Sequence, residues 1–228
     1  MNKEPRDKNL RRESASPPCF ADELESTCSE TDDASNADDS LWRTKQRQRL
    51  RSARKALSSH QRKTFSSQIR HHLLSLLEQE IKPTRLAAYW PIGGEPDVID
   101  CLAVLHDQGF ELSLPVVVAT DQPLIFRCWT PKTALVPGIW QIPVPDENQP
   151  ESNPEVVLMP LVGWDRRGYR LGNGGGFYDR TLAVLKPDPT VMGVGYQAAE
   201  LPSIRPQPHD IPCDLIITEN GPVRIADA

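Results

Sequence analysis

A strongly apolar run, a cluster of glycines and a helix-like segment follow one another between residues 155 and 186. Residues 155–162 (EVVLMPLV) form the best strand candidate in the sequence, because a short, continuous apolar run is typical of a strand covered on both faces. Glycines then stand at positions 172 and 174–176, and a helix is expected over about residues 177–186. Because α/β proteins place ligands at the carboxyl ends of strands, this order predicts an α/β fold with a ligand site in the glycine loop.

The rest of the sequence from residue 41 alternates strand-like and helix-like pieces. The segment 131–154 is expected to be largely irregular, because it is rich in proline and proline cannot donate to a strand ladder. A helix is expected over about residues 97–108. Further strands are expected at residues 85–90, 111–118, 124–129, 190–196 and 215–218. Such alternation indicates a mixed or parallel sheet that helices cover on both faces.

Charge divides the sequence into a tail and a single domain. Residues 1–40 hold eleven acids against five bases, and from residue 13 to residue 40 there are nine acids and no base. A segment of this kind repels itself and has little apolar surface to bury. We therefore expect residues 1–40 to be a disordered acidic tail and residues 41–228 to form one domain. The alternative for the tail is a segment that docks to a partner.

The charge reverses between residues 41 and 77, where no Asp or Glu occurs. Ser58, followed three residues later by Gln61, predicts a capping box that separates two helices. One stripe of the first helix is basic, and it consists of Arg43, Arg47, Arg51 and Arg54. A solvated helix face is the simplest alternative for this stripe. A nucleic-acid-binding module is another, but the nearly neutral charge of the whole domain disfavours it.

The cysteines and the hydropathy pattern point to a cytoplasmic protein. No run approaches the roughly 18–20 apolar residues that a membrane span requires, and the first residues lack the apolar core of a secretory signal. The five cysteines are scattered and include no C-x-x-C pair, so we expect reduced thiols. A catalytic role for Cys213 is the less favoured alternative to a buried structural thiol.

The glycine loop has the properties of an anion site. Glycine lets the backbone N–H groups approach a ligand closely, and the following helix adds the positive end of its dipole. Asp179, on the first turn of that helix, is a candidate ligand for Mg²⁺. Arginines that could bind phosphate oxygens flank the loop at Arg166, Arg167, Arg170 and Arg180. The loop matches neither a P-loop nor the dinucleotide fingerprint, and a glycine-rich surface loop is the alternative.

The segment RLGNGGGFYDR, residues 170–180, resembles the signature R-L-G-x-G-x-G-[YF]-Y-D of the 5-formyltetrahydrofolate cyclo-ligase family. Other pieces that fit in order are RKALS, YWPIGGEPD, GIWQIPVP, MPLVGWDRRGYR and PHDIPCDLIIT, so the resemblance covers about residues 43–218. It implies a three-layer α/β/α Rossmann-like fold. It also implies that ATP and Mg²⁺ drive the cyclisation of 5-formyltetrahydrofolate to 5,10-methenyltetrahydrofolate, with release of ADP and phosphate.

The resemblance assigns a role to each matching residue. Arg170 and Asp179 are implied to be catalytic, and Asp179 and Asp210 to bind Mg²⁺. The implied ATP-binding residues are Arg43, Thr44, Lys45, Gln46, Arg47, Arg170, Leu171, Gly172, Asn173, Gly174, Gly175, Gly176, Phe177 and Tyr178. The implied folate-binding residues are Tyr89, Trp90, Glu95, Asn173, Gly174, Gly175, Gly176 and Phe177. Arg43 stands where the family often has lysine, which leaves the register of the N-terminal basic residues open by one or two positions.

This chemistry is consistent with the residue types. The formyl oxygen is a poor leaving group until it is phosphorylated, and phosphoryl transfer needs positioning and charge neutralisation more than a protein nucleophile. Glu95 could accept hydrogen bonds from the pteridine, or it could be a solvated turn residue, and Asp210 could simply stabilise a turn. Trp140 could shield the adenine or fill the core. We expect a monomer with no nucleic-acid or membrane partner, and nucleotide binding without folate turnover remains an alternative function.

Overall fold

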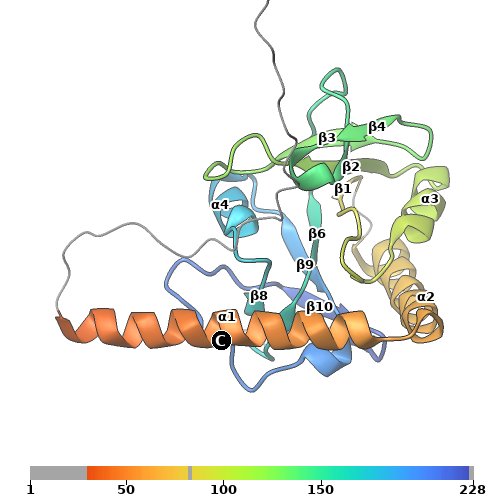
Figure 1. Ribbon diagram of the computed structural model, residues 1–228. Coiled ribbons are helices and arrows are strands. Elements are labelled where there is room, and N and C mark those ends of the chain that lie inside the picture. The colour runs from red at the N-terminus through yellow and green to blue at the C-terminus, as the bar shows by residue number, and fades with distance from the viewer. Residues whose placement is uncertain (1–29, 82–83, 226–228) are drawn as a thin grey trace, which may run out of the picture.

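The computed structural model describes residues 30–81 and 84–225, in which helices surround a central sheet (Figure 1). The helices are α1 (Glu30–Ala56), α2 (Ser59–Leu76), the π-helix η1 (Leu77–Ile81), α3 (Ile99–Asp107), the 3₁₀-helices η2 (Ile139–Gln141) and η3 (Gln197–Ala199), and α4 (Phe177–Val184). The strands are β1 (Arg85–Ala87), β2 (Glu111–Val116), β3 (Ile125–Trp129), β4 (Leu135–Pro137), β5 (Pro143–Pro145), β6 (Val156–Pro160), β7 (Gly163–Trp164), β8 (Arg170–Leu171), β9 (Thr190–Val194), β10 (Leu215–Thr218) and β11 (Gly221–Arg224).

The main sheet has seven strands in the order β11-β10-β9-β6-β1-β2-β3. The five inner strands are parallel, and the edge strands β3 and β11 are antiparallel to their neighbours. The sheet is therefore mixed, as the sequence predicts. From β1 the chain continues to β2 on one side and later returns to β6 on the other. This reversal of strand order makes the β1–β6 boundary the switch point where open α/β sheets bind ligands.

Both faces of the sheet are covered, which confirms the three-layer α/β/α architecture. Val156 and Leu158 of β6 belong to the apolar core that α2 and α3 cover. Val157 and Met159 point the other way, into a second core that contains Leu182 of α4. Figure 1 shows α2 and α3 on one side of the sheet and α4 on the other. The continuous apolar sequence of β6 follows from this arrangement, since successive strand residues face opposite layers.

Helix α1 runs across one end of the sheet and begins earlier than the sequence indicates. Its first residue is Glu30, whereas the predicted tail extends to residue 40. Residues 30–40 are therefore part of α1 in the described structure, and the boundary between tail and domain stays a prediction. Residues 1–29 of the predicted tail lie outside the described residues.

Arg205, in the loop that precedes β10, forms ion pairs with acidic residues near the start of α1. Its Nη1 lies 3.2 Å from a carboxylate oxygen of Asp38 and 2.9 Å from one of Asp39. The same guanidinium group lies over the ring of Trp42, 4.6 Å from the ring centre. These contacts order residues that charge alone would leave as a solvated tail.

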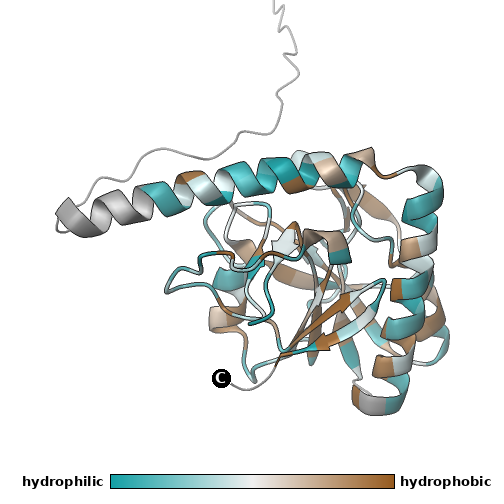
Figure 2. Cartoon of the chain, turned by 90° about the horizontal axis from the view of Figure 1, so that it is seen from below, coloured by the Kyte–Doolittle hydropathy of each residue, from teal (hydrophilic) through white to brown (hydrophobic). Residues whose placement is uncertain are grey.

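The junction between α1 and α2 confirms the predicted capping box. The hydroxyl of Ser58 accepts a hydrogen bond from the backbone N–H of Gln61, and the Gln61 side chain accepts one from the backbone of Ser58. Helix α2 then buries Ile69, Leu73 and Leu76 against the sheet. Figure 2 shows that α1 is hydrophilic over most of its described length, with isolated apolar positions.

The proline-rich segment is more regular than its composition predicts. Strands β4 and β5 pair Pro137 with Pro143 and Leu135 with Pro145 in a separate antiparallel ribbon. A two-stranded ribbon leaves one edge of each strand free, so a proline there need not interrupt a ladder. The sequence also does not predict the edge strand β11, because this strand contains Pro222 and lacks an apolar pattern. In the part of the chain that the structure describes, no helix is long and apolar enough to cross a bilayer.

Candidate functional site

A short hairpin supports the glycine loop at the carboxyl end of β6. Strands β7 and β8 pair antiparallel, and the chain then passes through the glycines into α4. Trp164 of β7 is fully buried, and its Nε1 donates to the backbone oxygen of Tyr196 at 3.1 Å. Gly174 and Gly176 have φ values of 101° and 63°, a left-handed conformation that side chains with a Cβ rarely adopt. The loop therefore depends on its glycines and rests on a rigid base.

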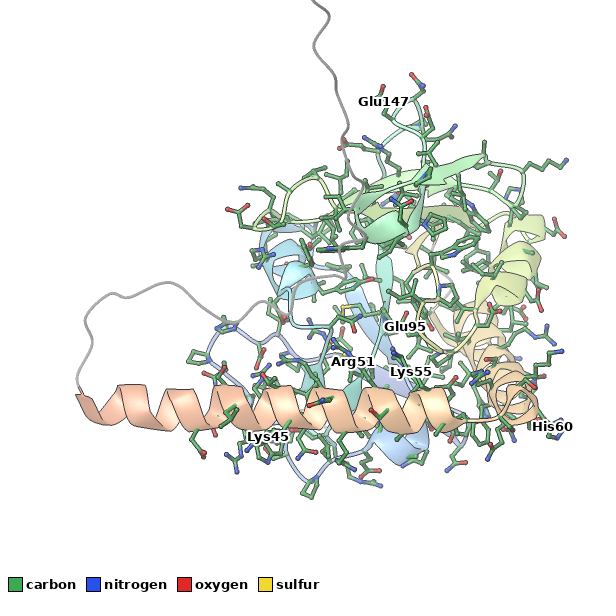
Figure 3. All side chains as sticks on the ribbon, viewed as in Figure 1. Lys45, Arg51, Lys55, His60, Glu95 and Glu147 are labelled. Carbon is green, nitrogen blue, oxygen red and sulfur yellow. The ribbon has the colours of Figure 1, made fainter. Side chains whose placement is uncertain are left out.

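The basic stripe of α1 lies over this loop. Arg47 Nε donates to the backbone oxygen of Gly172 at 3.0 Å. Arg51 Nη2 donates to the backbone oxygen and to Oδ1 of Asn173, at 2.8 and 3.0 Å. Figure 3 shows Arg51 and Glu95 between α1 and the sheet, and Lys45 on the opposite side of the helix. The alternative of a purely solvated helix face is thus wrong for this stripe.

Asp210 joins the same cluster from the loop before β10. Its two carboxylate oxygens accept from Arg43 at 2.6 and 3.1 Å, and Oδ2 also accepts from the backbone N–H of Gln207 at 2.7 Å. Burial alone would raise the pKa of Asp210, but the hydrogen bonds from Arg43 and Gln207 outweigh it and lower the pKa. Asp210 is therefore ionised at neutral pH and does more than stabilise its own turn.

Positive charge is concentrated at the centre of the stripe. Burial and then repulsion from Arg43 and Arg51 lower the pKa of Arg47 to about 10, and the more distant Asp210 only partly opposes this. Three guanidinium groups therefore lie on one helix face, and those of Arg47 and Arg51 bond to the glycine loop. A bound anion would relieve their mutual repulsion.

A second ion pair connects the exit of the loop to the Asp210 segment. Arg170 is buried, and its Nη2 donates to Oδ1 of Asp179 at 2.8 Å while its Nη1 donates to the backbone oxygen of Ile211. The backbone N–H of Ile211 donates to the same Asp179 oxygen at 3.1 Å. Asp179 and Asp210 thus belong to one continuous network, although each binds an arginine.

This carboxylate pair fits Mg²⁺ only in company with a ligand. No group of three His, Cys, Asp or Glu side chains that could hold a metal occurs among the described residues. Mg²⁺, however, commonly takes one or two carboxylates and completes its shell with phosphate oxygens and water. The donors therefore suit a metal that arrives with a phosphate group.

Glu95 closes the other side of the site, in the segment that follows β1. It is 5% exposed, accepts from the backbone N–H of Ile92 at 3.1 Å, and lies 3.5 Å from Nδ2 of Asn173 in the glycine loop. Burial raises its pKa, although the nearby Arg54 opposes the rise. Glu95 is therefore a buried acid at the switch point rather than a solvated turn residue.

Comparison with known proteins identifies the family. The model of the family described as 5-formyltetrahydrofolate cyclo-ligase matches residues 39–219. The chain belongs to this family. A 5-formyltetrahydrofolate cyclo-ligase of Haemophilus influenzae is 30% identical over 178 residues, covering 75% of this chain and 95% of the relative. One of Escherichia coli K12 is 28% identical over 175 residues, covering 74% of this chain and 96% of the relative.

Solved structures agree with the fold. The 5,10-methenyltetrahydrofolate synthetase of Aquifex aeolicus is similar with a TM-score of 0.70 and 29% identity, over 82% of this chain and 94% of that one. The synthetase of Mycoplasma pneumoniae gives a TM-score of 0.65 at 24% identity, over 78% of this chain and 98% of that one, and supports the fold alone. Family membership makes the chain a cyclo-ligase.

Not every residue implied for this cyclo-ligase lies at the loop. Thr44 and Lys45 are exposed, and Gln46 accepts a hydrogen bond from Arg49 on the same helix. The reason is helical geometry, since residues four apart share a face whereas the three between them point elsewhere. Leu171 is fully buried and belongs to the core rather than to a ligand surface.

Two of the flanking arginines are also engaged elsewhere. Arg166 pairs with Glu200 at 2.6 Å, and Arg167 bonds Asp165 at 3.1 Å. Only Arg170 and Arg180 of the predicted four bind groups in or beside the glycine loop. Arg51, in contrast, donates to the loop residue Asn173, and Arg54 donates to Gly93, just before Glu95. Neither arginine is among the residues to which the resemblance assigns a role. The four-residue spacing of the stripe was the available signal for Arg51.

The aromatic residues surround the loop in different ways. Trp140 is 40% exposed, and its ring packs edge-on against Phe177 with 5.8 Å between ring centres. It therefore does not fill the core. Arg180 lies over the other ring of this pair, 5.0 Å from the centre of Phe177. Tyr178 lies deeper, and burial raises its pKa. Trp90 is partly buried and packs against the core beneath α2 and α3.

Cys213 has the surroundings of a buried structural thiol. It is buried, and burial raises the pKa of its thiol to about 11, so the thiolate is scarce at neutral pH. Cys101, Cys128 and Cys213 are free thiols, which agrees with the prediction of reduced cysteines for the described part of the chain.

Proposed function

We propose that this cyclo-ligase uses ATP and Mg²⁺ to convert 5-formyltetrahydrofolate into 5,10-methenyltetrahydrofolate, releasing ADP and phosphate. The observation that carries the proposal is the basic stripe of α1 lying over the glycine loop, with Glu95 on the far side of the same loop. The glycine loop therefore lies between a site that suits phosphate and a carboxylate that suits hydrogen-bond donors. This arrangement suits the transfer of a phosphoryl group from nucleotide to folate.

The nucleotide is assigned to the glycine loop and to Arg43 and Arg47 of the stripe. Its phosphates would lie on the amides of the glycine loop and near the start of α4, where the helix dipole favours negative charge. Arg43 and Arg47 would bind phosphate oxygens, and the lowered pKa of Arg47 supports this, because it reflects buried positive charge that an anion would stabilise. Arg170 would keep Asp179 in place beside the loop.

Magnesium is assigned to Asp179 and Asp210. The two carboxylates belong to the network around Ile211 and Arg43, and at least one of their arginine contacts would be exchanged for the metal when the nucleotide binds. Bound there, Mg²⁺ would neutralise negative charge on the phosphate groups.

The folate is assigned to the Glu95 side of the loop. The Glu95 carboxylate would accept hydrogen bonds from the pteridine amino and ring N–H groups, and Trp90 and Phe177 would supply apolar contacts. Tyr89, which the resemblance also implies, is 2% exposed and lies in the core. The formyl oxygen attacks the γ-phosphorus and ADP leaves. N10 then bonds to the formyl carbon, the C–O bond breaks, inorganic phosphate departs, and the N10 proton is released to solvent. The protein positions the two substrates and excludes water, and it needs no nucleophile of its own.

The test follows the absorbance of the methenyl product after purified protein is mixed with 5-formyltetrahydrofolate and MgATP. We expect product formation that stops when ATP is omitted or when EDTA removes divalent metal. Nucleotide binding without any rise in absorbance would contradict the proposal and favour a protein that binds nucleotide without folate turnover. We place the enzyme in the cytoplasm as a monomer, without nucleic-acid or membrane partners.

Gly172→Ala separates ligand binding from folding. Gly172 does not have positive φ, and an added Cβ would meet no atom within 4 Å, so nothing in the described structure requires a glycine there. A phosphate group that approaches the backbone would require it. We expect an unchanged Tm but MgATP binding weakened about fivefold, or about 1 kcal/mol, as measured by calorimetry. Wild-type affinity in this variant would argue against close approach of the nucleotide to the loop.

A further inference from the structure

Arg54 occupies an unusual position at the end of the basic stripe. It is 9% exposed, and its Nε donates to the backbone oxygen of Gly93 at 3.1 Å. Its Nη1 is buried without a hydrogen-bond partner and lies 3.6 Å from Oε1 of Glu95. A buried guanidinium nitrogen that lacks a hydrogen bond is costly, and here the charge of Glu95 is what offsets that cost.

We propose that Arg54 is a positioning residue that keeps Glu95 ionised and fixed in one orientation for the pteridine of the folate substrate. The proposal rests on the assignment of Glu95 to folate in the proposed function. Because Nη1 has no exposed surface, this nitrogen, which faces Glu95, does not touch a ligand in this arrangement. It acts through Glu95 and through the turn that it holds at Gly93.

Of the positive charges that act on Glu95, Arg54 has the larger effect, and its Nη1 lies 3.6 Å from Oε1 of Glu95. Arg51 lowers the pKa of Glu95 less than Arg54 does, and the tyrosines Tyr89, Tyr178 and Tyr196 stay neutral because burial raises the pKa of each. Glu95 also borders a cavity of about 540 Å³, whose other charged lining residues are Arg62, Lys63, Arg70, Asp97 and Asp100. Nη1 of Arg70 lies 3.6 Å from Oδ2 of Asp100. Loss of Arg54 would therefore remove the largest influence that opposes burial at the Glu95 carboxyl, and only the weaker effects of Ile92, Asn173 and Arg51 would remain.

The sign of the expected pH effect follows from this arrangement. Burial raises the pKa of Glu95 and Arg54 lowers it, so removing Arg54 moves the pKa further up, towards neutral pH. Protonated Glu95 loses its charge and accepts hydrogen bonds from the pteridine less well. The KM for folate in an Arg54→Gln variant should therefore rise as the pH falls.

The experiment measures kcat and KM for 5-formyltetrahydrofolate between pH 6 and pH 9 at saturating MgATP. We expect a flat KM in the wild type and a KM that rises about fivefold from pH 9 to pH 6 in Arg54→Gln, with kcat and the KM for MgATP unchanged. Arg49→Gln is the matched control, because Arg49 lies on the same helix and bonds Gln46 only along that helix. It should behave as the wild type.

Two results would overturn the inference. One is a KM for folate in Arg54→Gln that stays flat over this pH range, and the other is a loss confined to kcat. If Arg54→Gln does not fold, Arg54→Lys keeps the inference testable, because lysine retains the charge and should keep the pH profile flat. A low-pH rise of KM in Arg54→Lys would contradict the inference. Absence of turnover in the wild type would instead contradict the proposed function on which it rests.

Discussion

Arg170→Ala is expected to lower kcat/KM for 5-formyltetrahydrofolate by more than about tenfold, or 1.4 kcal/mol. Arg170 connects the glycine loop to Asp179 and to the backbone of Ile211, next to Asp210. Without it, Asp179 loses its charged partner and both proposed metal ligands lose a common support. Asp179→Asn should cause a loss of similar size, because it removes the carboxylate charge while preserving shape.

A matched control distinguishes this effect from general loss of an arginine. Arg85 pairs with Glu155 at 2.9 Å at the amino end of the central strands, and both side chains are more than a third exposed. An exposed ion pair of this kind contributes little, so Arg85→Ala should retain activity within about twofold. Steady-state rates and Tm values of Arg170→Ala, Asp179→Asn and Arg85→Ala show whether the loss of activity is specific to the site. Wild-type kinetics in either Arg170→Ala or Asp179→Asn would refute the assigned roles.

Gly168→Ala is expected to destabilise the protein by about 3 kcal/mol, through left-handed backbone strain and a steric clash. Gly168 has a φ of 85° in the β7–β8 hairpin, and an added Cβ would lie 2.5 Å from the backbone oxygen of Cys213. A backbone oxygen cannot rotate away as a side chain can. The corresponding fall in Tm is roughly 6–12 °C for a domain of this size, measurable by thermal denaturation.

Gly109→Ala is the comparison that isolates the clash. Gly109 also has a positive φ, of 93°, but an added Cβ would meet no atom within 4 Å. Only the backbone strain remains, so we expect Gly109→Ala to destabilise the protein by about 1 kcal/mol. Equal Tm values for the two variants would show that the hairpin can move away from Cys213, and that it is a less rigid base for the loop than the structure indicates.

The sheet and the glycine loop were predictable because their signals are local. The apolar run of β6, the glycines and the first turn of α4 lie within one short stretch, and each element obeys its own periodicity. The capping box at Ser58 was equally readable. The comparisons confirm the fold and the family that these segments suggested.

The contacts of the site were not predictable in the same way. Spacing shows that Arg43, Arg47 and Arg51 share a helix face, but only the packing of α1 over the loop determines which groups they bind. The early start of α1 likewise depends on Arg205, which lies more than 160 residues away along the chain. The β4–β5 ribbon was missed because prolines suppress the strand signal, although pairing at free edges tolerates them.

We propose that Arg43 and Arg47 of α1 and the glycine loop form one site for MgATP. Titration calorimetry of the wild-type protein with MgATP tests it most directly, because binding is read without any folate chemistry. We expect saturable heat with one site per chain. A protein that is folded by circular dichroism and yet gives no binding heat at several temperatures would contradict it.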